Sequence, residues 1–397
     1  MLLEEIKNLS QKIFPEVVKL RRHLHANPEL SYQEVNTGQF IAKQLKAIGI
    51  AHEHGWAENG AVAIIEGKKK GNKVIALRAD IDALPIIETN DVPYKSKTEG
   101  IMHACGHDAH TASLLGTAMI LNGVREHFGG TIKLIFQPAE EKLPGGASIL
   151  IKEGVLENPT PLSIFGQHVH PPLEAGKVGL CSGRYMASAD ELYLTVKGKG
   201  GHGALPQNGV DPLVIVSTII LSLQQIVSRN ANPYIPTVLT FGKINSVGGA
   251  TNVIPDEIKL EGTFRTMDEA WRDEAHRKMI HMAEQIANGF GGSCDFKVVK
   301  GYPVLHNNEA LTAKAKQYAI EYLGAAQVVD LPPRMTAEDF SYYSQVIPAC
   351  FYRLGTGNKT KGITSPVHTS TFDIDEKSLS LSTGLMAWMA ICELGGG

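Results

Sequence analysis

The sequence predicts an α/β protein with a mainly parallel-sheet domain, into which a smaller ferredoxin-like α+β unit is inserted. Three observations predict this fold. Apolar strand-like runs alternate with helical segments at both ends of the chain, a half-exposed strand pattern begins near residue 187, and no long linker separates the two regions. The chain has 397 residues, of which 43% are hydrophobic and 20% charged, so its length fits two or three ordinary domains.

The outer region alternates strands and helices. We expect a helix at about 2–26, strands at Ala61–Glu66 and Lys73–Ala79, a helix from about Asp108 to Val124, a strand at Thr131–Phe136, a short helix near Ala147–Glu153 and a strand at Leu162–Gln167. Towards the C-terminus we expect helices near 309–323, 337–345 and 376–393 and a strand at Ala349–Leu354. This order indicates a mainly parallel sheet covered on both faces.

The inserted region has a different pattern of strands and helices. Leu192, Leu194 and Val196 alternate with polar neighbours, which is typical of a half-exposed strand. A helix at about 211–229, strands at Thr237–Asn245 and Glu257–Arg265, a helix at about 269–289 and a strand at Cys294–Lys300 follow. The order β-α-β-β-α-β is that of a ferredoxin-like unit. We therefore predict a discontinuous domain of residues 1–186 and 299–397 and an inserted domain of residues 187–298.

Composition excludes several classes of partner. The 38 Lys and Arg nearly balance the 41 Asp and Glu, so no global field favours nucleic acid, and the basic run Lys68–Lys70 is interpreted as a solvated hairpin turn. The longest uninterrupted apolar run, Leu385–Cys392, is far shorter than the roughly 20 residues of a membrane helix, and no secretory signal opens the chain. We therefore expect a cytoplasmic protein. Its five scattered cysteines predict free thiols rather than a disulfide framework.

Residues 103–110, HACGHDAH, are unusually dense in soft and borderline metal ligands. Cys105 and His107 flank a glycine just before a predicted helix, so a tight loop can direct both side chains to one point. His103 and His110 are expected to point elsewhere. Imidazole and thiolate favour zinc, cobalt, nickel or manganese over magnesium or calcium.

Three further segments carry candidate ligands. Glu140 and Glu141 follow a predicted strand, so that one carboxylate is free to bind a metal while its neighbour acts as general base. His168 ends another strand, and His368 lies in the last loop before the C-terminal helix. Because ligands gather at the carboxyl ends of strands in open α/β sheets, we expect these segments to converge.

Asp80 and Asp82 end the strand that precedes the HACGHDAH loop. Their carboxylates suit the orientation of a ligand histidine, and Asp80 is our candidate for that role. An ion pair between Arg78 and Asp80 is the equally good structural alternative.

Assembled, these segments resemble the M20 metallopeptidase and amidohydrolase family, in the branch of N-acyl-amino-acid amidohydrolases, hippurate hydrolases and auxin-conjugate hydrolases. The resemblance runs from Leu20 to the C-terminal helix. It rests on RRHLHANPELS (21–31), RADIDALP (78–85), HACGHDAH (103–110), FQPAEE (136–141), GQHVHP (166–171), GKGGHGALP (198–206), TNVIPD (251–256), GTFRT (262–266) and the His368 loop.

The resemblance implies a site and an activity. Two divalent transition-metal ions (Zn, Mn, Co or Ni) would be held by five residues, with Glu140 as general base: Cys105, His107, Glu141, His168 and His368. The inserted unit would be a lid and dimerisation domain, and its His202 would stabilise the oxyanion. Asn252 and Arg265 are candidates for binding the carboxylate of the substrate.

The chain departs from the family pattern in three places. The last loop reads VHTSTFD, Gln207 replaces a histidine common after Pro206, and Arg78 stands where related two-metal peptidases have a ligand histidine. Cys105 compensates in this branch, which implies an oxidation-sensitive site.

The expected function is metal-dependent hydrolysis of N-acyl-L-amino acids or short peptides by a homodimer, with neither nucleic acid nor membrane as a partner. The alternatives are a dipeptidase or carboxypeptidase, a deacetylase of N-acetyl-diaminopimelate, or a non-catalytic metal-binding protein. Intact Glu140 argues against the last of these.

Overall fold

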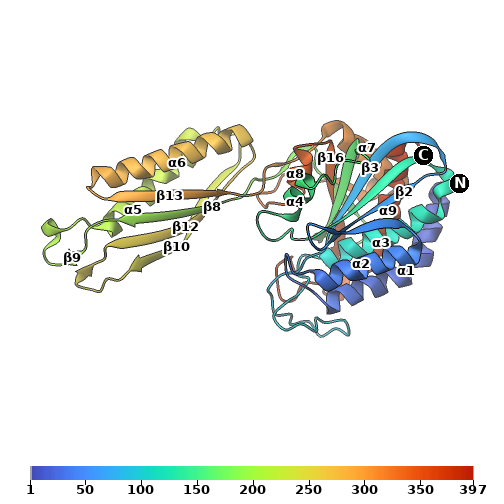
Figure 1. Cartoon of the computed structure of the whole chain (residues 1–397), viewed down its shortest axis with the longest axis horizontal. Coiled ribbons are helices and arrows are strands. Elements are labelled where there is room, and N and C mark those ends of the chain that lie inside the picture. Colours follow the sequence, from blue (N-terminus) through green and yellow to red (C-terminus); the bar gives the residue numbers. More distant parts are fainter. Residues whose placement is uncertain (1, 397) are drawn as a thin grey trace. The chain divides into compact units, whose positions relative to one another are not determined.

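A computed structural model describes residues 2–396, which form two compact units (Figure 1). Unit 1 comprises the chain up to Gly183, His306–Pro332 and the chain from Asp339 onwards, and unit 2 comprises Arg184–Leu305 and Pro333–Glu338. The insertion therefore begins at Arg184 rather than at 187 and ends at Leu305 rather than at 298. The return of Pro333–Glu338 to unit 2 has no counterpart in the prediction.

Unit 1 is built on an eight-stranded mixed sheet in the order β1-β2-β4-β3-β5-β16-β6-β15. Its strands are β1 (Ala51–Trp56), β2 (Gly60–Glu66), β3 (Lys69–Asp80), β4 (Gly129–Gln137), β5 (Ser163–Glu174), β6 (Val178–Leu180), β15 (Val328–Asp330) and β16 (Ala349–Gly357). The central strands β4, β3, β5 and β16 are parallel, as predicted, whereas β1, β2 and β6 add antiparallel pairs. The hairpin predicted at Lys68–Lys70 is wrong, because β4 lies between β2 and β3.

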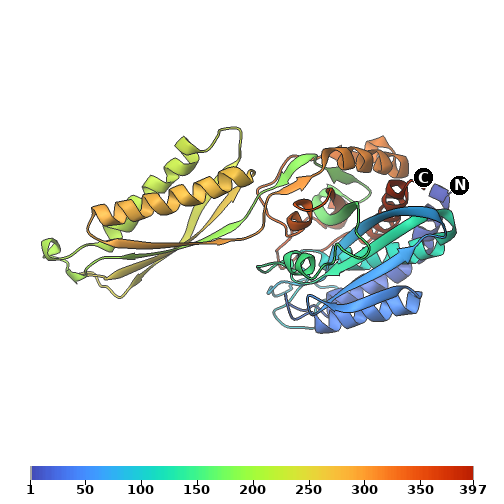
Figure 2. The ribbon, with the colours of Figure 1, turned by 45° about the horizontal axis from the view of Figure 1, so that its top comes forward.

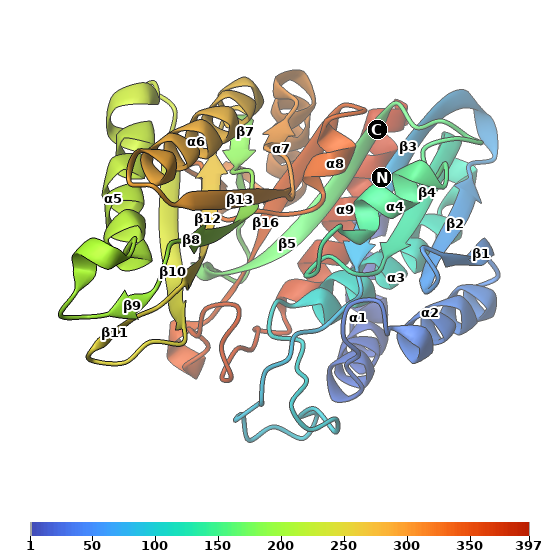
Figure 3. The same cartoon turned by 60° about the vertical axis from the view of Figure 1, so that its left-hand side comes forward.

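Helices cover both faces of this sheet (Figures 2 and 3). One face carries α1 (Leu2–Ala26), α2 (Val35–Ile48), α3 (His107–Gly123), α7 (Glu309–Leu323) and α9 (Ser378–Leu394), and the other carries the short α4 (Gly146–Lys152) and α8 (Ser341–Ser344). Ile75, Leu77 and Ala79 of β3 belong to the apolar core under the long helices. Side chains alternate along a strand, so Arg78 and Asp80 point to the opposite face.

Unit 2 confirms the predicted β-α-β-β-α-β order. Its elements are β8 (Asp190–Lys197), α5 (Pro212–Gln225), β10 (Thr237–Val247), β12 (Glu257–Thr266), α6 (Glu269–Gly289) and β13 (Ser293–Lys300). The four strands form an antiparallel sheet in the order β10-β12-β8-β13, and α5 and α6 cover one of its faces with a separate apolar core (Figure 3).

Shorter elements complete the chain. Two small ladders join β9 (Gly201–His202) to β11 (Val253–Ile254) and β7 (Gly183–Met186) to β14 (Leu305–Asn307). Single helical turns lie at Arg125–His127, Pro206–Asn208, Ile226–Asn230, Ala325–Gln327 and Lys359–Lys361.

One described helix, Pro212–Asn230, is long and apolar enough to cross a membrane by length and composition alone. Ile215, Val216, Ile219 and Leu223 bury one of its faces in the core of unit 2, which accounts for much of its apolar character. Helices of this kind also occur in protein cores, so the feature is weak evidence for a membrane span.

Candidate metal centre

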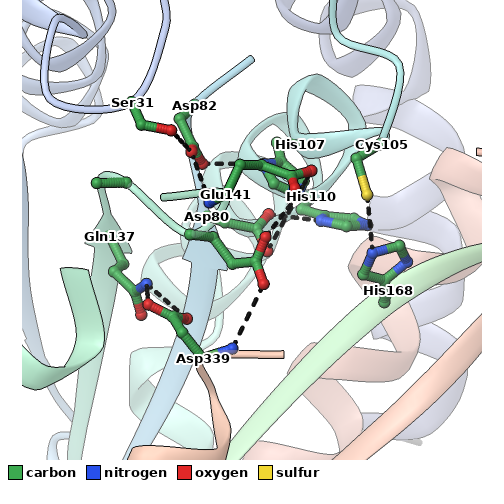
Figure 4. A network of polar contacts seen from close by, with 12 residues as sticks. Ser31, Asp80, Asp82, Cys105, His107, His110, Gln137, Glu141, His168 and Asp339 are labelled. Atoms are coloured by element: carbon green, nitrogen blue, oxygen red, sulfur yellow. Dashed lines mark hydrogen bonds and ion pairs between the residues drawn. The ribbon is translucent and has the colours of Figure 1, made fainter. Parts of the chain in front are cut away.

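The predicted ligand segments converge at one end of the central sheet of unit 1 (Figure 4). The strands β3 and β4 end at Asp80 and Gln137, α3 begins at His107, and His168 lies within β5. Because β5 continues to Glu174, the prediction that His168 ends its strand is wrong, although the side chain still joins the cluster.

Cys105 is the residue that two candidate metal clusters share. Its Sγ lies 3.3 Å from Nε2 of His168 and 3.3 Å from Nε2 of His368. Ligand atoms of Cys105, His107 and His168 lie within 4.8 Å of one another, as do those of Cys105, Glu141 and His368. A single thiolate is therefore able to contact ions in both clusters.

The glycine between Cys105 and His107 is required by the local backbone. Gly106 has φ +83°, and a Cβ added there would lie 2.6 Å from Cγ2 of Val169. Because glycine alone adopts this conformation without strain and leaves room for Val169, the chain can turn into α3 with both ligands on the same side.

His107 is held with Nε2 directed towards the site. Its Nδ1 lies 3.0 Å from Oδ1 of Asp82, which suits donation by Nδ1 and directs Nε2 towards the site. Nε2 is buried and has no hydrogen-bond partner. Burial lowers the pKa of His107, but Asp80, Asp82 and Glu141 outweigh it and raise the pKa to about 10. The surrounding carboxylates therefore favour positive charge at this point.

His168 is oriented in the same way by the backbone. Its Nδ1 donates to the carbonyl oxygen of Val169 at 2.8 Å, so Nε2 keeps its lone pair and faces Cys105. Burial is the largest cause of its lowered pKa, and the nearby Arg353 also contributes. The ring is therefore neutral, which is the form that binds metals.

Asp80, predicted to orient a ligand histidine, lies beside His107 and is hydrogen-bonded to His110. Its Oδ1 accepts from Nδ1 of His110 at 2.6 Å, and Nε2 of His110 accepts from the backbone N–H of Val169 at 2.9 Å. Asp82 accepts the hydrogen bond from Nδ1 of the ligand ring of His107, while Oδ2 of Asp80 lies 3.7 Å from Nε2 of the same ring. Asp80 also fixes His110, which fixes the Val169 peptide beside His168.

Arg78 hydrogen-bonds to three side chains next to the site. Its guanidinium donates to Asp80 (2.6 Å), Asp339 (2.7 Å) and Gln137 (2.9 Å), and it is almost fully buried. The structure therefore contains the Arg78–Asp80 ion pair.

The adjacent carboxylates Glu140 and Glu141 follow a residue in the left-handed region, Ala139, whose φ is +53°. The N–H of Ala139 donates to Oε1 of Glu34 at 2.7 Å, and the N–H of Glu141 donates to Oδ2 of Asp82 at 3.0 Å. Glu141 Oε1 is buried without a hydrogen-bond partner and lies 3.3 Å from Nε2 of His368. Glu140 is also buried, and its Oε1 accepts from the N–H of Asp339 at 3.4 Å.

His368 is the most exposed of the five predicted ligands, with 51% of its side chain accessible. It has φ +64°, and its N–H donates to the carbonyl oxygen of Ala104 at 2.8 Å. The loop that carries it is thereby attached directly to the loop that carries Cys105.

The three predicted residues of the inserted domain lie in unit 2. His202 is exposed and pairs with Val253 in the β9–β11 ladder, and the N–H of Gly203 donates to the carbonyl oxygen of Asn252 at 2.8 Å. His202 and Asn252 therefore belong to one loop cluster. Arg265 lies on β12, where its Nη1 donates to the carbonyl oxygen of Met335 at 3.4 Å, and burial lowers its pKa.

The donor set fits divalent transition ions. It combines one thiolate, three imidazoles and one carboxylate, with Nε2 of His107 and Oε1 of Glu141 buried and unpartnered. The cluster also contains Glu140 beside His107 and Glu141, which leaves one carboxylate for proton transfer.

Sequence reasoning missed two supporting residues. Glu34 holds the backbone before Glu140, and the fully buried Arg21 binds Asp108 next to His107. A signal for Arg21 was available, because Arg21 lies on the same face of α1 as the apolar residues Val17 and Leu24.

The chain is similar to several known proteins. Residues 76–390 match the model of peptidase family M20/M25/M40. The chain is 43% identical over 365 residues to an N-acetyl-L-cysteine deacetylase of Bacillus subtilis, covering 92% of this chain and 85% of that protein. It is 38% identical over 395 residues to thermostable carboxypeptidase 2 of Saccharolobus solfataricus, covering 98% of each.

A solved structure is also similar along the whole chain. It is the YXEP protein of Bacillus subtilis, described as a dinuclear metal-binding peptidase of the M20 family. The two share 36% identity with a TM-score of 0.84, and the alignment covers 98% of this chain and 100% of that one.

Proposed function

The chain belongs to peptidase family M20/M25/M40, and on that premise we propose that it hydrolyses the amide bond of N-acyl-L-amino acids, with two divalent transition-metal ions as cofactors. Family membership makes it a hydrolase of the peptidase and amidohydrolase type. The observation that carries the finer proposal is the position of Cys105 between two ligand clusters, with Glu140 beside them.

Five residues would hold the ions: Cys105, His107, Glu141, His168 and His368. When bound, two divalent ions supply Lewis acidity towards the scissile carbonyl and towards water. Among this chain's own residues, Asp82 holds the ring of His107 and the Val169 carbonyl holds that of His168, so both Nε2 atoms are ready to ligate.

Glu140 is assigned as the general base. It is buried, and it lies next to a carboxylate that would ligate. Glu140 accepts a proton from the attacking water and returns it to the nitrogen of the departing amino acid, so that the amide C–N bond breaks as the amine forms.

The substrate assignment is supported by a similar protein and by the carboxylate that its substrate carries. The deacetylase relative is named for an N-acetylated amino acid, and such substrates carry a free carboxylate. We assign His202 to stabilise the oxyanion and Asn252 and Arg265 to bind that carboxylate, as the family resemblance implies.

A second candidate is removal of C-terminal amino acids from short peptides, since a relative aligned along 98% of the chain is named a carboxypeptidase. Peptide cleavage would use the same metal centre and the same base, and the amine released would again be an amino acid with a free carboxylate.

We further propose a homodimer formed through unit 2. Its outer strand β10 is a sheet edge, and several apolar side chains of the unit are exposed: Leu213, Val214, Leu221, Ile244 and Val247. Cytoplasmic location remains our expectation from the sequence.

The test is a substrate panel. Protein reconstituted separately with Mn²⁺, Co²⁺, Ni²⁺ and Zn²⁺ is assayed on N-acetyl amino acids, hippurate and dipeptides, with Glu140→Gln as the matched inactive control. We expect the highest kcat/KM on an N-acyl amino acid and at least about 10²-fold less activity in the control. Higher kcat/KM on dipeptides would favour the peptidase, and equal activity in Glu140→Gln would contradict the mechanism.

A further inference from the structure

Arg21 is a fully buried guanidinium on α1 that contacts carboxylates from two distant segments of unit 1. Its Nε donates to Oδ2 of Asp108 at 2.8 Å, and its Nη2 donates to Oδ1 of Asp373 at 2.8 Å. Its Nη1 lies 3.4 Å from Oε1 of Glu376. One side chain therefore connects the beginning of α3 to the loop before α9.

Both segments carry proposed ligands. Asp108 directly follows His107 in the first turn of α3, and Asp373 follows His368 in the same loop. The arginine is thus attached to one ligand-bearing segment on each side.

The loop that carries His368 depends on such contacts, because it belongs to no helix or strand and its histidine is half exposed. Besides the His368 N–H bond to Ala104, further contacts hold this loop: the N–H of Thr89 donates to the Ser370 carbonyl oxygen, Asn90 donates to the Phe372 carbonyl oxygen, and the Tyr94 hydroxyl donates to Oδ2 of Asp373. Tyr94 also faces the guanidinium of Arg21, 4.7 Å from its ring centre. Asp373 and Glu376 are the residues of this loop that accept from the guanidinium of Arg21.

We propose that Arg21 is a positioning residue for the metal centre: by binding Asp108 and Asp373 together, it fixes the separation between His107 and His368. The proposal rests on the metal-dependent function proposed above. It adds that Arg21 helps to set the affinity of the site for one of the two metal ions. A planar guanidinium offers several donors in a fixed fork, which lysine cannot reproduce.

Arg22 provides a matched control. It is the next residue on α1, its guanidinium lies 4.8 Å from the same Tyr94 ring centre, and it donates to both oxygens of Glu376 at 2.9 and 2.6 Å. Its side chain is 44% exposed, and its described hydrogen bonds attach α1 to the loop before α9 at Glu376 but do not reach Asp108 at the start of α3. A general effect of weakening α1 should therefore appear in both variants.

The experiment measures Co²⁺ binding by competition with a chelator, with the thiolate-to-Co²⁺ charge-transfer absorption as a reporter of Cys105. We expect Arg21→Lys to weaken one of the two Co²⁺ affinities by about 10–100-fold and to alter this absorption. Arg22→Lys should stay within about 3-fold of wild type at both sites. The thermal midpoint of each metal-free variant separates metal affinity from fold stability.

Asp373→Asn is the second variant, because it removes one contact from a partly exposed side chain and leaves the buried Arg21–Asp108 pair intact. It should weaken the same Co²⁺ site, and the double variant Arg21→Lys/Asp373→Asn should lose less than the sum of the two single losses. If both single variants bind Co²⁺ like wild type, the inference is wrong while the proposed function stands. If wild type binds fewer than two Co²⁺, or its absorption persists in Cys105→Ser, the proposed function itself fails.

Discussion

The backbone around Glu140 and Glu141 gives these two adjacent carboxylates different positions in the site. Ala139 occupies the left-handed region, and Glu34 and Asp82 hold the peptide N–H groups of Ala139 and Glu141. The two adjacent carboxylates therefore have different surroundings: Glu141 Oε1 lies near His368, while Glu140 is contacted by the Asp339 N–H. The pair is predicted to divide into one ligand and one base.

Amide substitutions test this division. Glu140→Gln should keep both metal ions while kcat falls by roughly 10²–10⁴, because a general base is lost without a ligand. Glu141→Gln should lose metal, which elemental analysis after gel filtration would detect. The reverse pattern of metal content would show that the two roles are exchanged.

The raised pKa of Glu34 leads us to expect that the stability of the fold depends on pH. Burial, with repulsion from Asp82, raises its pKa from 4.5 to about 7. Between these values the folded state keeps a proton that the unfolded state has released, so the stability falls as pH rises and levels off above about 7. The unfolding free energy of metal-free wild type minus that of Glu34→Gln should therefore be about 2–3 kcal/mol larger at pH 5 than at pH 8. Urea denaturation at both values measures it, and a difference independent of pH would contradict the assignment.

At the scale of elements, the sequence predicts the helices and central strands because their apolar spacing is strong. It misses β1, since most of its side chains are exposed and lack alternation, and it misses α2. It also extends α8, which contains only Ser341–Ser344. The convergence of the segments that carry the five proposed ligands could be predicted from the strand ends, whereas the assignment of all five as ligands rests on the family resemblance.

The residues that orient the ligands could not be predicted in the same way. Asp80 ends β3 and Asp82 lies beyond it, so the choice between them depends on the path of the backbone after the strand. Likewise, Arg21 meets Asp108 and Asp373 only through the packing of α1 against α3 and the loop before α9. The burial of Arg21 can be predicted from its place on the apolar face of α1, but its partners cannot, because contacts of such long sequence separation leave no local pattern.

A buried ion pair between elements yields a prediction for unit 2. Asp190 at the start of β8 binds Arg272 and His276 of α6, which hold its pKa below the ordinary value although burial raises it. Asp190→Asn should destabilise unit 2 by up to about 3–5 kcal/mol at neutral pH, and wild type should lose this advantage as pH falls through the lowered pKa.

The matched control is Asp273→Asn, which removes an exposed pair with Lys300 from the same helix and should cost less than about 1 kcal/mol. Hydrogen exchange followed by mass spectrometry reports unit 2 separately from unit 1. Similar protection of unit 2 in the two variants would show that the buried ion pair stabilises unit 2 no more than the exposed pair does.

At the scale of the whole molecule, the chain combines a metal-binding unit with an inserted unit that carries His202. The proposed homodimer predicts complementation between inactive variants. If His202 serves the partner's site, mixing Glu140→Ala and His202→Ala chains should restore about one site in four after statistical exchange. The assay is activity after mixing, with exchange verified by mass-tagged chains. Mixed dimers without activity would eliminate the shared site.

Anomalous diffraction from crystals of the Zn²⁺-reconstituted protein would locate the metal ions that Cys105 is proposed to join. We predict two anomalous peaks per chain, each about 2.3 Å from Sγ of Cys105, with His107 and His168 contributing Nε2. Crystals of Cys105→Ser should show reduced occupancy at both. A single peak in the wild-type protein, or two peaks of which neither touches Cys105, would show that Cys105 does not join two metal ions.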